Sequence, residues 1–319
     1  MIILTGGAGF IGTNMLIALN DKGIDDILVV DNIATTPKWK NLAGRSFRQY
    51  VHKNLLWDWL DQNKIEKVEA VLHLGACTDT MACDFDYLAQ NNIHYSQKLW
   101  QICTERQIPF IYASSAATYG DGSFGFSDDH DKTFQYRPIN PYGYSKHLFD
   151  LWALKQYITP PRWYGIKFFN VYCPYESHKE RMASVAHFAI PQALGDGKIR
   201  LFKSYRKDCS DGDQKRDFVY VQDAVDIVLH LLNTSGPNGL YNAGTGKAQT
   251  FNHLADAIFK ALEKPVKIQY FDMPDALQDS YQYFTEADMR KLISTPCDYQ
   301  PKSLKEGIAT YVNWYLENQ

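Results

Sequence analysis

The sequence has no long hydrophobic run, no CxxC cysteine motif and no large excess of charge of either sign. No apolar stretch approaches the roughly 18 residues that a membrane-spanning helix needs. The opening stretch, MIILTGG, lacks the basic region and the small-residue cleavage site of a secretory signal. We therefore expect a cytoplasmic protein that has no membrane partner.

Charge and cysteine usage exclude two further classes of protein. Lys and Arg number 33 and Asp and Glu number 36, and the two signs are mixed along the chain, so there is no basic stripe of the kind that nucleic-acid binding needs. The six cysteines show no metal-ligand spacing, and several lie in apolar surroundings. We expect reduced thiols, no metal site and no nucleic-acid partner.

The first half of the chain alternates short segments rich in Val and Ile with segments of helical period. Strands are predicted at residues 2–4, 26–32, 68–76, 108–116 and 162–172, and helices at residues 10–23, 91–107 and 144–158. This alternation predicts an α/β fold, with a Rossmann-like doubly wound parallel sheet covered by helices on both faces.

The pattern becomes irregular after about residue 170, and the elements predicted there are shorter. They are a strand and helix at 216–232, a strand at 239–246, a helix at 250–262 capped by Thr250, and a last helix at 303–317. We assign residues 1–168 and about 214–247 to a nucleotide-binding domain. Residues 169–213 and 248–319 are expected to form a smaller, mixed α/β C-terminal lobe for the substrate, partly interleaved with that domain.

The stretch TGGAGFIGTN is typical of a phosphate-binding turn. It fits G-x-G-x-x-G at Gly7, Gly9 and Gly12, and G-x-x-G-x-x-G when Gly6 replaces Gly7. A strand precedes it and a helix follows, so the helix N-terminus can face a pyrophosphate. Asp31 ends the second strand, 19 residues past Gly12, where a carboxylate meets the adenosine ribose. Together these features predict dinucleotide binding.

The residues alone leave the choice between NAD and NADP open. Asp31 favours NAD because it would repel a 2′-phosphate, whereas Lys38 or Lys40 in the next loop could pair with that phosphate. Further along, HLGACT (residues 73–78) ends a strand in small residues that would let a cofactor pass close to the backbone. The Asn91 amide follows and is a further candidate contact.

The stretch NPYGYSKH contains the predicted catalytic pair. Tyr142 and Lys146 are four residues apart, which places them on one face of a helix, whereas Tyr144 points away from Lys146. A nearby ammonium lowers the pKa of a phenol, and such a tyrosine can exchange a proton with a carbinol while a nicotinamide exchanges hydride with the carbon. Ser114 and Ser115, at the end of the preceding strand, are both candidates to orient the same oxygen.

Four motifs together, TGGAGFIG, SSAATYG, YGYSK and RDFVYVQD, resemble the extended short-chain dehydrogenase/reductase family, which contains nucleotide-sugar epimerases and dehydratases. The segments ESHKERMASVA and NAGTGKAQTF are similar to one branch of it, a group of nucleotide-sugar 6-epimerases, and this resemblance runs over nearly the whole chain. It implies an isomerase that uses NADP, acts on a nucleotide sugar through a keto intermediate, and assembles into a pentamer-based homo-oligomer.

The resemblance also implies roles for individual residues. Tyr142 and Lys179 would be the two acid/base groups, assisted by Lys146 and Ser115. The residues expected to bind the cofactor, including the glycines of the turn, are Gly6, Gly9, Phe10, Ile11, Gly12, Asp31, Asn32, Lys38, Lys53, Leu74, Gly75, Ala76, Cys77, Thr78, Asn91, Lys146, Val171 and Lys179. Those expected to contact the substrate are Asn170, Arg181, Phe188, Phe202, Lys203, Ser204, Tyr205, Arg216 and Tyr281.

Several positions leave alternatives open. A guanidinium such as that of Arg216 suits a diphosphate, but a salt bridge with Asp217 or Asp223 would also explain it. The branch has a glutamate where Leu74 stands and a serine where Arg181 stands, so the sugar could differ. The rival functions are another nucleotide-sugar epimerase or a dehydratase, and a non-catalytic NADP-binding regulator. The stretch SSAAT lacks the acid pair of a dehydratase, and such regulators usually lose the tyrosine or the lysine.

Overall fold

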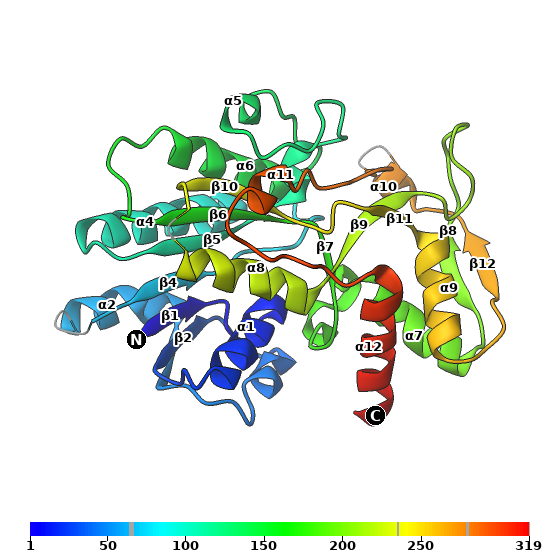
Figure 1. Ribbon diagram of the computed structural model, residues 1–319, viewed down its shortest axis with the longest axis horizontal. Helices are drawn as coiled ribbons and strands as arrows, with labels where there is room; N and C mark the ends of the chain where they lie inside the picture. The colour runs from blue at the N-terminus through cyan, green and yellow to red at the C-terminus, as the bar shows by residue number, and fades with distance from the viewer. Residues whose placement is uncertain (64–66, 235, 279–280, 319) are drawn as a thin grey trace.

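A seven-stranded sheet forms the centre of the larger part of the molecule (Figure 1). The structure, a computed structural model, describes residues 1–63, 67–234, 236–278 and 281–318. The strands pair in the order β10-β6-β5-β4-β1-β2-β3, and every pairing is parallel. They are β1 (Ile2–Thr5), β2 (Ile27–Asp31), β3 (Gln49–His52), β4 (Ala70–His73), β5 (Phe110–Ser115), β6 (Trp163–Phe168) and β10 (Gly239–Ala243). The predicted Rossmann-like fold is confirmed.

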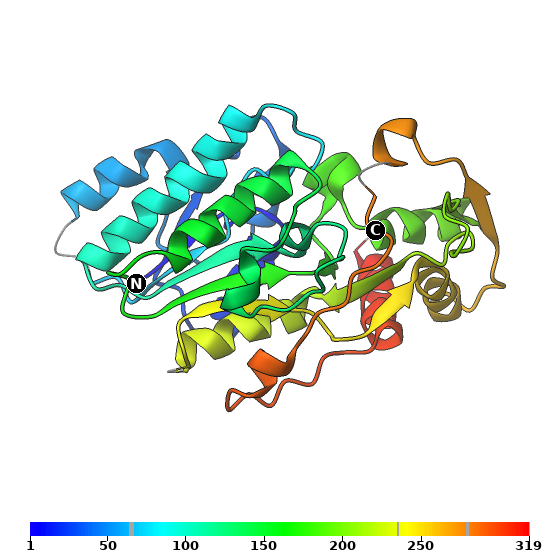
Figure 2. The same ribbon diagram turned by 90° about the horizontal axis from the view of Figure 1, so that it is seen from above.

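Helices cover both faces of this sheet because successive residues of a strand point to opposite sides. Leu4 of β1 lies in the core cluster that contains Val225, whereas its neighbour Ile3 lies in the cluster that contains Trp100 and Phe149. Figure 2 shows α4 and α6 side by side on the second face, where the rings of Trp100 and Phe149 meet. The helices of this part are α1 (Phe10–Asp21), α2 (Leu56–Gln62), α3 (Phe85–Leu88), α4 (Tyr95–Glu105), α5 (His130–Thr133), α6 (Pro141–Leu154) and α8 (Val221–Asn233).

A smaller part lies beyond the carboxyl ends of the sheet strands (Figure 1). It contains a three-stranded sheet of β7 (Asn170–Tyr172), β9 (Lys215–Tyr220) and β11 (Ala248–Thr250), and a parallel pair of β8 (Ile199–Phe202) and β12 (Ile268–Phe271). Its helices are α7 (Val185–Gly195), α9 (Phe251–Ala261) and α12 (Leu304–Glu317), which share one apolar cluster. The Thr250 side chain accepts a hydrogen bond from the His253 amide at 2.9 Å, which confirms the predicted cap of α9.

The two parts are interleaved along the chain. Met289 and Leu292, at the helix α11 (Arg290–Ile293), lie in the same core cluster as β1 and α8, although they come from the stretch assigned to the substrate lobe. Strand β9, from a stretch assigned to the nucleotide-binding domain, pairs with β7 of the smaller part. The division at residues 168, 214 and 247 stays a prediction.

Short elements complete the chain and carry several site residues. Each is too short to show a periodic pattern of its own. They are the 3-10 turns η1 (Pro37–Asn41), η2 (Lys53–Leu55), η4 (Ala116–Tyr119) and η5 (Ser177–Met182), the π-helical turn η3 (Ala89–His94), and the one-turn helix α10 (Asp275–Gln278). Residues 91–94 of the π-helical turn nevertheless fall within the helix predicted at 91–107.

The order of the strands in the central sheet reverses between β1 and β4. At such a point open α/β sheets bind their ligands, beyond the carboxyl ends of the strands.

Candidate active site

The glycine turn between β1 and α1 is shaped for close approach to a ligand. Gly6 has a φ of 69°, which a residue with a side chain rarely adopts, and a Cβ atom on Gly12 would collide with the Gly6 carbonyl oxygen. Gly9 is the N-cap of α1 and offers no side-chain cap, so the first-turn N–H groups are left for another acceptor. This arrangement fits a pyrophosphate at the positive end of the helix.

Asp31, at the end of β2, is engaged on both of its oxygens. One accepts a hydrogen bond from the Ala8 amide at 2.9 Å, and the other accepts from the Lys38 ammonium at 2.6 Å. Asp31, the carboxylate predicted to contact the ribose, therefore also stabilises the glycine turn through Ala8 and forms an ion pair with Lys38. Lys53 donates a hydrogen bond to the Asn91 amide oxygen, and burial lowers the pKa of this lysine.

Three adjoining cavities contain every residue predicted to bind the cofactor. The adenosine cavity, defined here by Asp31, Asn32, Lys38, Lys53 and Asn91, has a volume of about 210 Å³. The glycine groove, of about 550 Å³, is lined by Gly6, Gly9, Phe10, Ile11, Gly12 and the segment 74–79 on one side and by residues 178–182 on the other. The catalytic cavity, of about 360 Å³, adds Lys146 and Val171 to its walls. The roles of these residues stay predictions.

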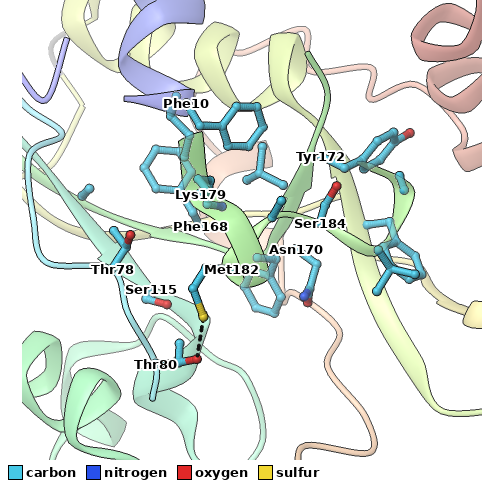
Figure 3. A pocket seen from close by; sticks show the side chains of 18 of the residues that line it. Phe10, Thr78, Thr80, Ser115, Phe168, Asn170, Tyr172, Lys179, Met182 and Ser184 are labelled. Atoms are coloured by element: carbon cyan, nitrogen blue, oxygen red, sulfur yellow. Dashed lines mark hydrogen bonds between the residues drawn. The ribbon is translucent and has the colours of Figure 1, made fainter. Parts of the chain in front are cut away.

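The catalytic cavity brings together the four residues predicted to act in catalysis, although they come from distant parts of the chain. Ser115 ends β5, Tyr142 and Lys146 lie on α6, and Lys179 lies in η5. Figure 3 shows Lys179 beside Phe10 and Phe168, across the cavity from Ser115. Tyr142 and Lys179, the two groups predicted to exchange protons, therefore line one cavity.

Helix α6 separates the two tyrosines of the predicted pair. Asn140 caps this helix by accepting a hydrogen bond from the Gly143 amide at 2.7 Å, and the turn that follows directs Tyr142 inward. Tyr142 is buried, whereas Tyr144 is 45% exposed and meets the ring of Phe85 at a centroid distance of 5.7 Å. Tyr142 is thus the tyrosine that faces the catalytic cavity.

The pKa of Tyr142 is set mainly by its burial and not by Lys146. Burial raises its pKa, and a hydrogen bond with the Ser115 side chain partly opposes that rise. Lys146 donates a hydrogen bond to the Ala113 carbonyl at 2.9 Å, and burial lowers its own pKa to about 8 against the opposing charge of Asp150. The expectation that Lys146 lowers the Tyr142 pKa is therefore not confirmed, because burial raises that pKa and the group that opposes the rise is Ser115.

The structure distinguishes the two serines at the end of β5. Ser114 donates a hydrogen bond to Asp150 at 2.7 Å, and Lys167 donates to the same carboxylate oxygen at 2.6 Å. Asp150 and Lys167 are both fully buried. Ser115 instead accepts from the Ala117 amide and hydrogen-bonds Tyr142. Ser115 is therefore the serine that lies next to Tyr142, while Ser114 is held by Asp150. The catalytic role of Ser115 stays a prediction.

Lys179 lies where the catalytic cavity meets the glycine groove. Its ammonium is 3.7 Å from a carboxylate oxygen of Glu176 and 5.1 Å from the centroid of the Phe10 ring. Apart from the resemblance, no sequence pattern marks Lys179 as functional. Glu176 was missed altogether, because an acidic residue in an irregular loop carries no signal of its own.

A fourth cavity, the aromatic pocket, lies in the smaller part and has a volume of about 440 Å³. Its walls include six of the residues predicted to contact the substrate, namely Asn170, Arg181, Phe188, Phe202, Arg216 and Tyr281. The guanidinium of Arg216 lies 5.0 Å from the centroid of the Tyr281 ring and 5.6 Å from that of Phe251. Such a pocket suits a planar base together with an anionic group.

The alternative partners of Arg216 are engaged elsewhere. Asp217 accepts hydrogen bonds from the amides of Thr245, at 2.8 Å, and of Ala287, at 3.0 Å. Asp223 accepts from the Lys302 amide at 2.9 Å. Burial lowers the pKa of Arg216, and among the described residues no carboxylate forms an ion pair with it to offset this desolvation.

The remaining predicted substrate residues lie after β8, outside the walls of the cavities described above. Lys203 and the Tyr205 hydroxyl both meet Asp272 at 3.1 Å, and the Ser204 amide donates to Asp211 at 2.7 Å. These partners hold the segment at the rim of the smaller part. A substrate contact from these three residues stays a prediction.

The described residues contain neither a group of metal-ligating side chains nor a membrane-spanning helix. In the ranges 1–63, 67–234, 236–278 and 281–318, no group of three or more His, Cys, Asp or Glu side chains could hold a metal ion. No helix within the same ranges is both long enough and apolar enough to cross a membrane.

Comparison with known proteins now places the chain. Residues 2–244 match the model of the NAD dependent epimerase/dehydratase family. An ADP-L-glycero-D-manno-heptose-6-epimerase of Nitratidesulfovibrio vulgaris (strain DP4) is 48% identical over 99% of this chain and 98% of its own. One of that name from Fusobacterium nucleatum subsp. nucleatum is 44% identical over 100% of this chain and 99% of its own.

A solved structure agrees with these relatives. The crystal structure of the Helicobacter pylori ADP-L-glycero-D-manno-heptose-6-epimerase superposes with a TM-score of 0.82 at 27% identity, covering 98% of this chain and 95% of that chain. The chain therefore belongs to the NAD dependent epimerase/dehydratase family and is an epimerase that uses a nicotinamide cofactor.

Proposed function

We propose that this protein converts ADP-D-glycero-D-manno-heptose to ADP-L-glycero-D-manno-heptose by inverting C6″ through a transient 6″-keto intermediate. The reaction would supply heptose for the core of lipopolysaccharide, in the cytoplasm. The observation that carries the proposal is that Tyr142 and Lys179, from distant elements, line one cavity next to the glycine groove. The 44–48% identity to relatives that bear this name supports the choice of sugar.

We propose NADP as the cofactor. Lys38 neutralises Asp31 at 2.6 Å, so the carboxylate no longer argues against a 2′-phosphate. Lys53 lines the same adenosine cavity and provides a second cation for that phosphate. When bound, the nicotinamide supplies reversible hydride transfer at the secondary carbinol carbon.

The protein's own residues are proposed to move the protons. Tyr142, as the phenolate formed once cofactor and substrate are bound, takes the proton of the 6″-hydroxyl, with Ser115 orienting the oxygen. Lys179 exchanges a proton with that oxygen when the carbon is approached from its other side. Inversion needs a group for each face, which explains why the tyrosine alone does not suffice. Arg216 would hold the diphosphate, and the rings of the aromatic pocket would hold the adenine.

The walls of the catalytic cavity disfavour a dehydratase. A dehydratase needs a carboxyl group beside the reacting sugar carbon to remove a proton. Among the described residues that line the catalytic cavity there is no Asp and no Glu. Another nucleotide-sugar epimerase remains the alternative, and a non-catalytic regulator is disfavoured because Tyr142 and Lys146 are both present and buried.

The direct test follows purified protein and ADP-D-glycero-D-manno-heptose by NMR. We expect the C6″ configuration to interconvert without net oxidation, and NADP to co-purify with the protein. An unchanged C6″ would contradict the sugar assignment, and activity with NAD but none with NADP would contradict the cofactor assignment. Normal epimerisation by Lys179→Ala would contradict the use of two proton-exchanging groups; Lys207→Ala, at an exposed lysine, is the matched control.

We also propose a pentamer-based homo-oligomer, on the resemblance alone. Native mass spectrometry of the purified chain should give masses that are multiples of five times 36.6 kDa. A monomer at micromolar concentration would contradict this assembly.

A further inference from the structure

A single buried carboxyl group is hydrogen-bonded to both ends of the segment that carries Lys179. Glu176 is fully buried, between β7 and α7. One of its oxygens accepts hydrogen bonds from the Cys173 amide at 3.2 Å and the Ser184 hydroxyl at 2.7 Å, and the other accepts from the Ser184 amide at 2.7 Å. Both ends of the segment 173–184 therefore meet at one side chain.

The backbone of this segment is strained between those two ends. Tyr175 has a φ of 73° and Glu180 a φ of 47°, in the left-handed region that residues with a Cβ atom avoid. Such a backbone persists only where surrounding contacts hold it. The bonds of Glu176 are contacts of this kind, and a hydrogen bond at 3.3 Å between His178 and the Asn41 amide fixes the middle of the segment.

Glu176 also faces the lysine directly. Its second oxygen lies 3.7 Å from the Lys179 ammonium, and among the described residues it is the carboxylate within 4.0 Å of that ammonium. Burial lowers the pKa of the neighbouring His178 and His187. The glycine groove beside Lys179 is also lined by the charged residues Asp31, Lys38, Asp79, Glu180 and Arg181. Asp31 pairs with Lys38 at 2.6 Å and Asp79 with Arg181 at 3.3 Å, so Glu176 is the carboxylate that contacts Lys179 directly.

We infer that Glu176 is the positioning residue for Lys179: it holds the segment 173–184 against the catalytic cavity and keeps the lysine ammonium beside its own carboxylate. The inference rests on the proposed function, in which Lys179 exchanges a proton with the substrate. Glu176 does not line the catalytic cavity or the glycine groove, so it acts through the lysine rather than on the sugar.

An NMR titration of Lys179 tests the inference without substrate. The lysines are converted to ¹³C-dimethyl-lysines, which keep their charge, and the Lys179 signal is assigned as the one missing from Lys179→Arg. If the two side chains are paired, removal of the opposite charge in Glu176→Gln should lower the titration midpoint of the Lys179 signal relative to the wild type. Ser184→Ala, which removes the hydroxyl hydrogen bond to Glu176 but no charge, should leave the midpoint unchanged. A midpoint in Glu176→Gln equal to that of the wild type would overturn the inference.

Kinetics separate this inference from the proposed function. Glu176→Gln should lower kcat for epimerisation about tenfold and move the alkaline limb of the pH–rate profile to lower pH. Glu176→Asp keeps the charge, so its alkaline limb should stay at the wild-type pH although its kcat is reduced. If Glu176→Gln does not fold, Glu176→Asp must still show a reduced kcat because its carboxylate is one methylene shorter, and a wild-type kcat there would overturn the inference. A wild-type enzyme that does not epimerise the sugar would instead contradict the proposed function. The NMR titration would still show whether Glu176 and Lys179 are paired.

Discussion

At the scale of single residues, Tyr142 is the group on which the proposed chemistry depends most. It is buried, yet it lines the catalytic cavity and hydrogen-bonds Ser115. Its raised pKa means that the phenol carries its proton at neutral pH until the cofactor and substrate are bound. Because a protonated phenol cannot accept a proton, the proposed chemistry requires Tyr142 to lose its own proton before it takes that of the substrate.

Tyr142→Phe should remove this proton exchange while leaving the ring packing in place. We expect kcat to fall about 10²- to 10⁴-fold, the range for loss of a general acid/base. Tyr144→Phe, two residues along the same helix but exposed, should retain the wild-type rate. The rates are measured by NMR under saturating substrate, and equal rates for the two variants would contradict the assignment of Tyr142.

Cofactor choice also belongs to single residues. Lys38→Ala and Lys53→Ala should each weaken NADP binding about tenfold and change NAD binding much less, because each removes one cation from the 2′-phosphate. Lys40→Ala is the matched control: Lys40 is exposed and its ammonium lies 5.9 Å from the centroid of the neighbouring Trp39 ring. Calorimetric titration of the cofactor-free protein measures the affinities. An equal loss for NAD and NADP would contradict the proposed phosphate contact.

At the scale of elements, the sequence was most informative where one function is contained in one short stretch. The glycine turn, Asp31 and the pair Tyr142 and Lys146 could be predicted because β1, α1, β2 and α6 each follow a local pattern. Contacts between distant segments had no such pattern. For that reason the short strands β3, β8 and β12 could not be predicted, nor could the buried contacts that Asp150 of α6 makes with Ser114 and Lys167.

The buried pair of Asp150 on α6 and Lys167 on β6 is the clearest contact of this kind. Asp150 also accepts from the Tyr112 hydroxyl at 3.0 Å, and Lys167 donates to Thr118 at 2.7 Å. Asp150→Ala would leave a buried ammonium without its partner, so the free energy of unfolding should fall by about 3–5 kcal/mol.

Urea denaturation measures that loss, and a second variant provides the control. Lys167→Met in the Asp150→Ala background removes the orphaned charge and should recover part of the stability. Losses from the two single substitutions that simply add in the double variant would show that the pair is not coupled and would contradict this account.

At the scale of the whole molecule, buried neutral histidines make the fold sensitive to acid. His73 is 3% exposed and hydrogen-bonds Thr5 at 2.6 Å and Ser96 at 2.9 Å. Burial lowers its pKa to about 3 from the ordinary 6.5, and burial lowers that of His147 to about 4. Because the folded-state pKa is the lower one, protonation favours the unfolded chain, and stability is lost as the pH falls below about 6.5.

From His73 alone, we expect the free energy of unfolding to fall by roughly 2 to 3 kcal/mol between pH 7 and pH 4.5. Chemical denaturation at several pH values measures the slope. His73→Gln should flatten it, whereas His253→Gln, at an exposed histidine, should leave it unchanged. The same slope in His73→Gln and the wild type would show that His73 is not the group responsible.

The central claim, that C6″ is inverted by removing and returning one hydride within a single site, concerns the whole molecule because both parts enclose that site. The measurement that tests it most directly uses ADP-D-glycero-D-manno-heptose carrying deuterium at C6″, epimerised in ordinary water and analysed by NMR and mass spectrometry. The account predicts that the product keeps its deuterium at C6″. A product that has exchanged the deuterium for solvent hydrogen would contradict it.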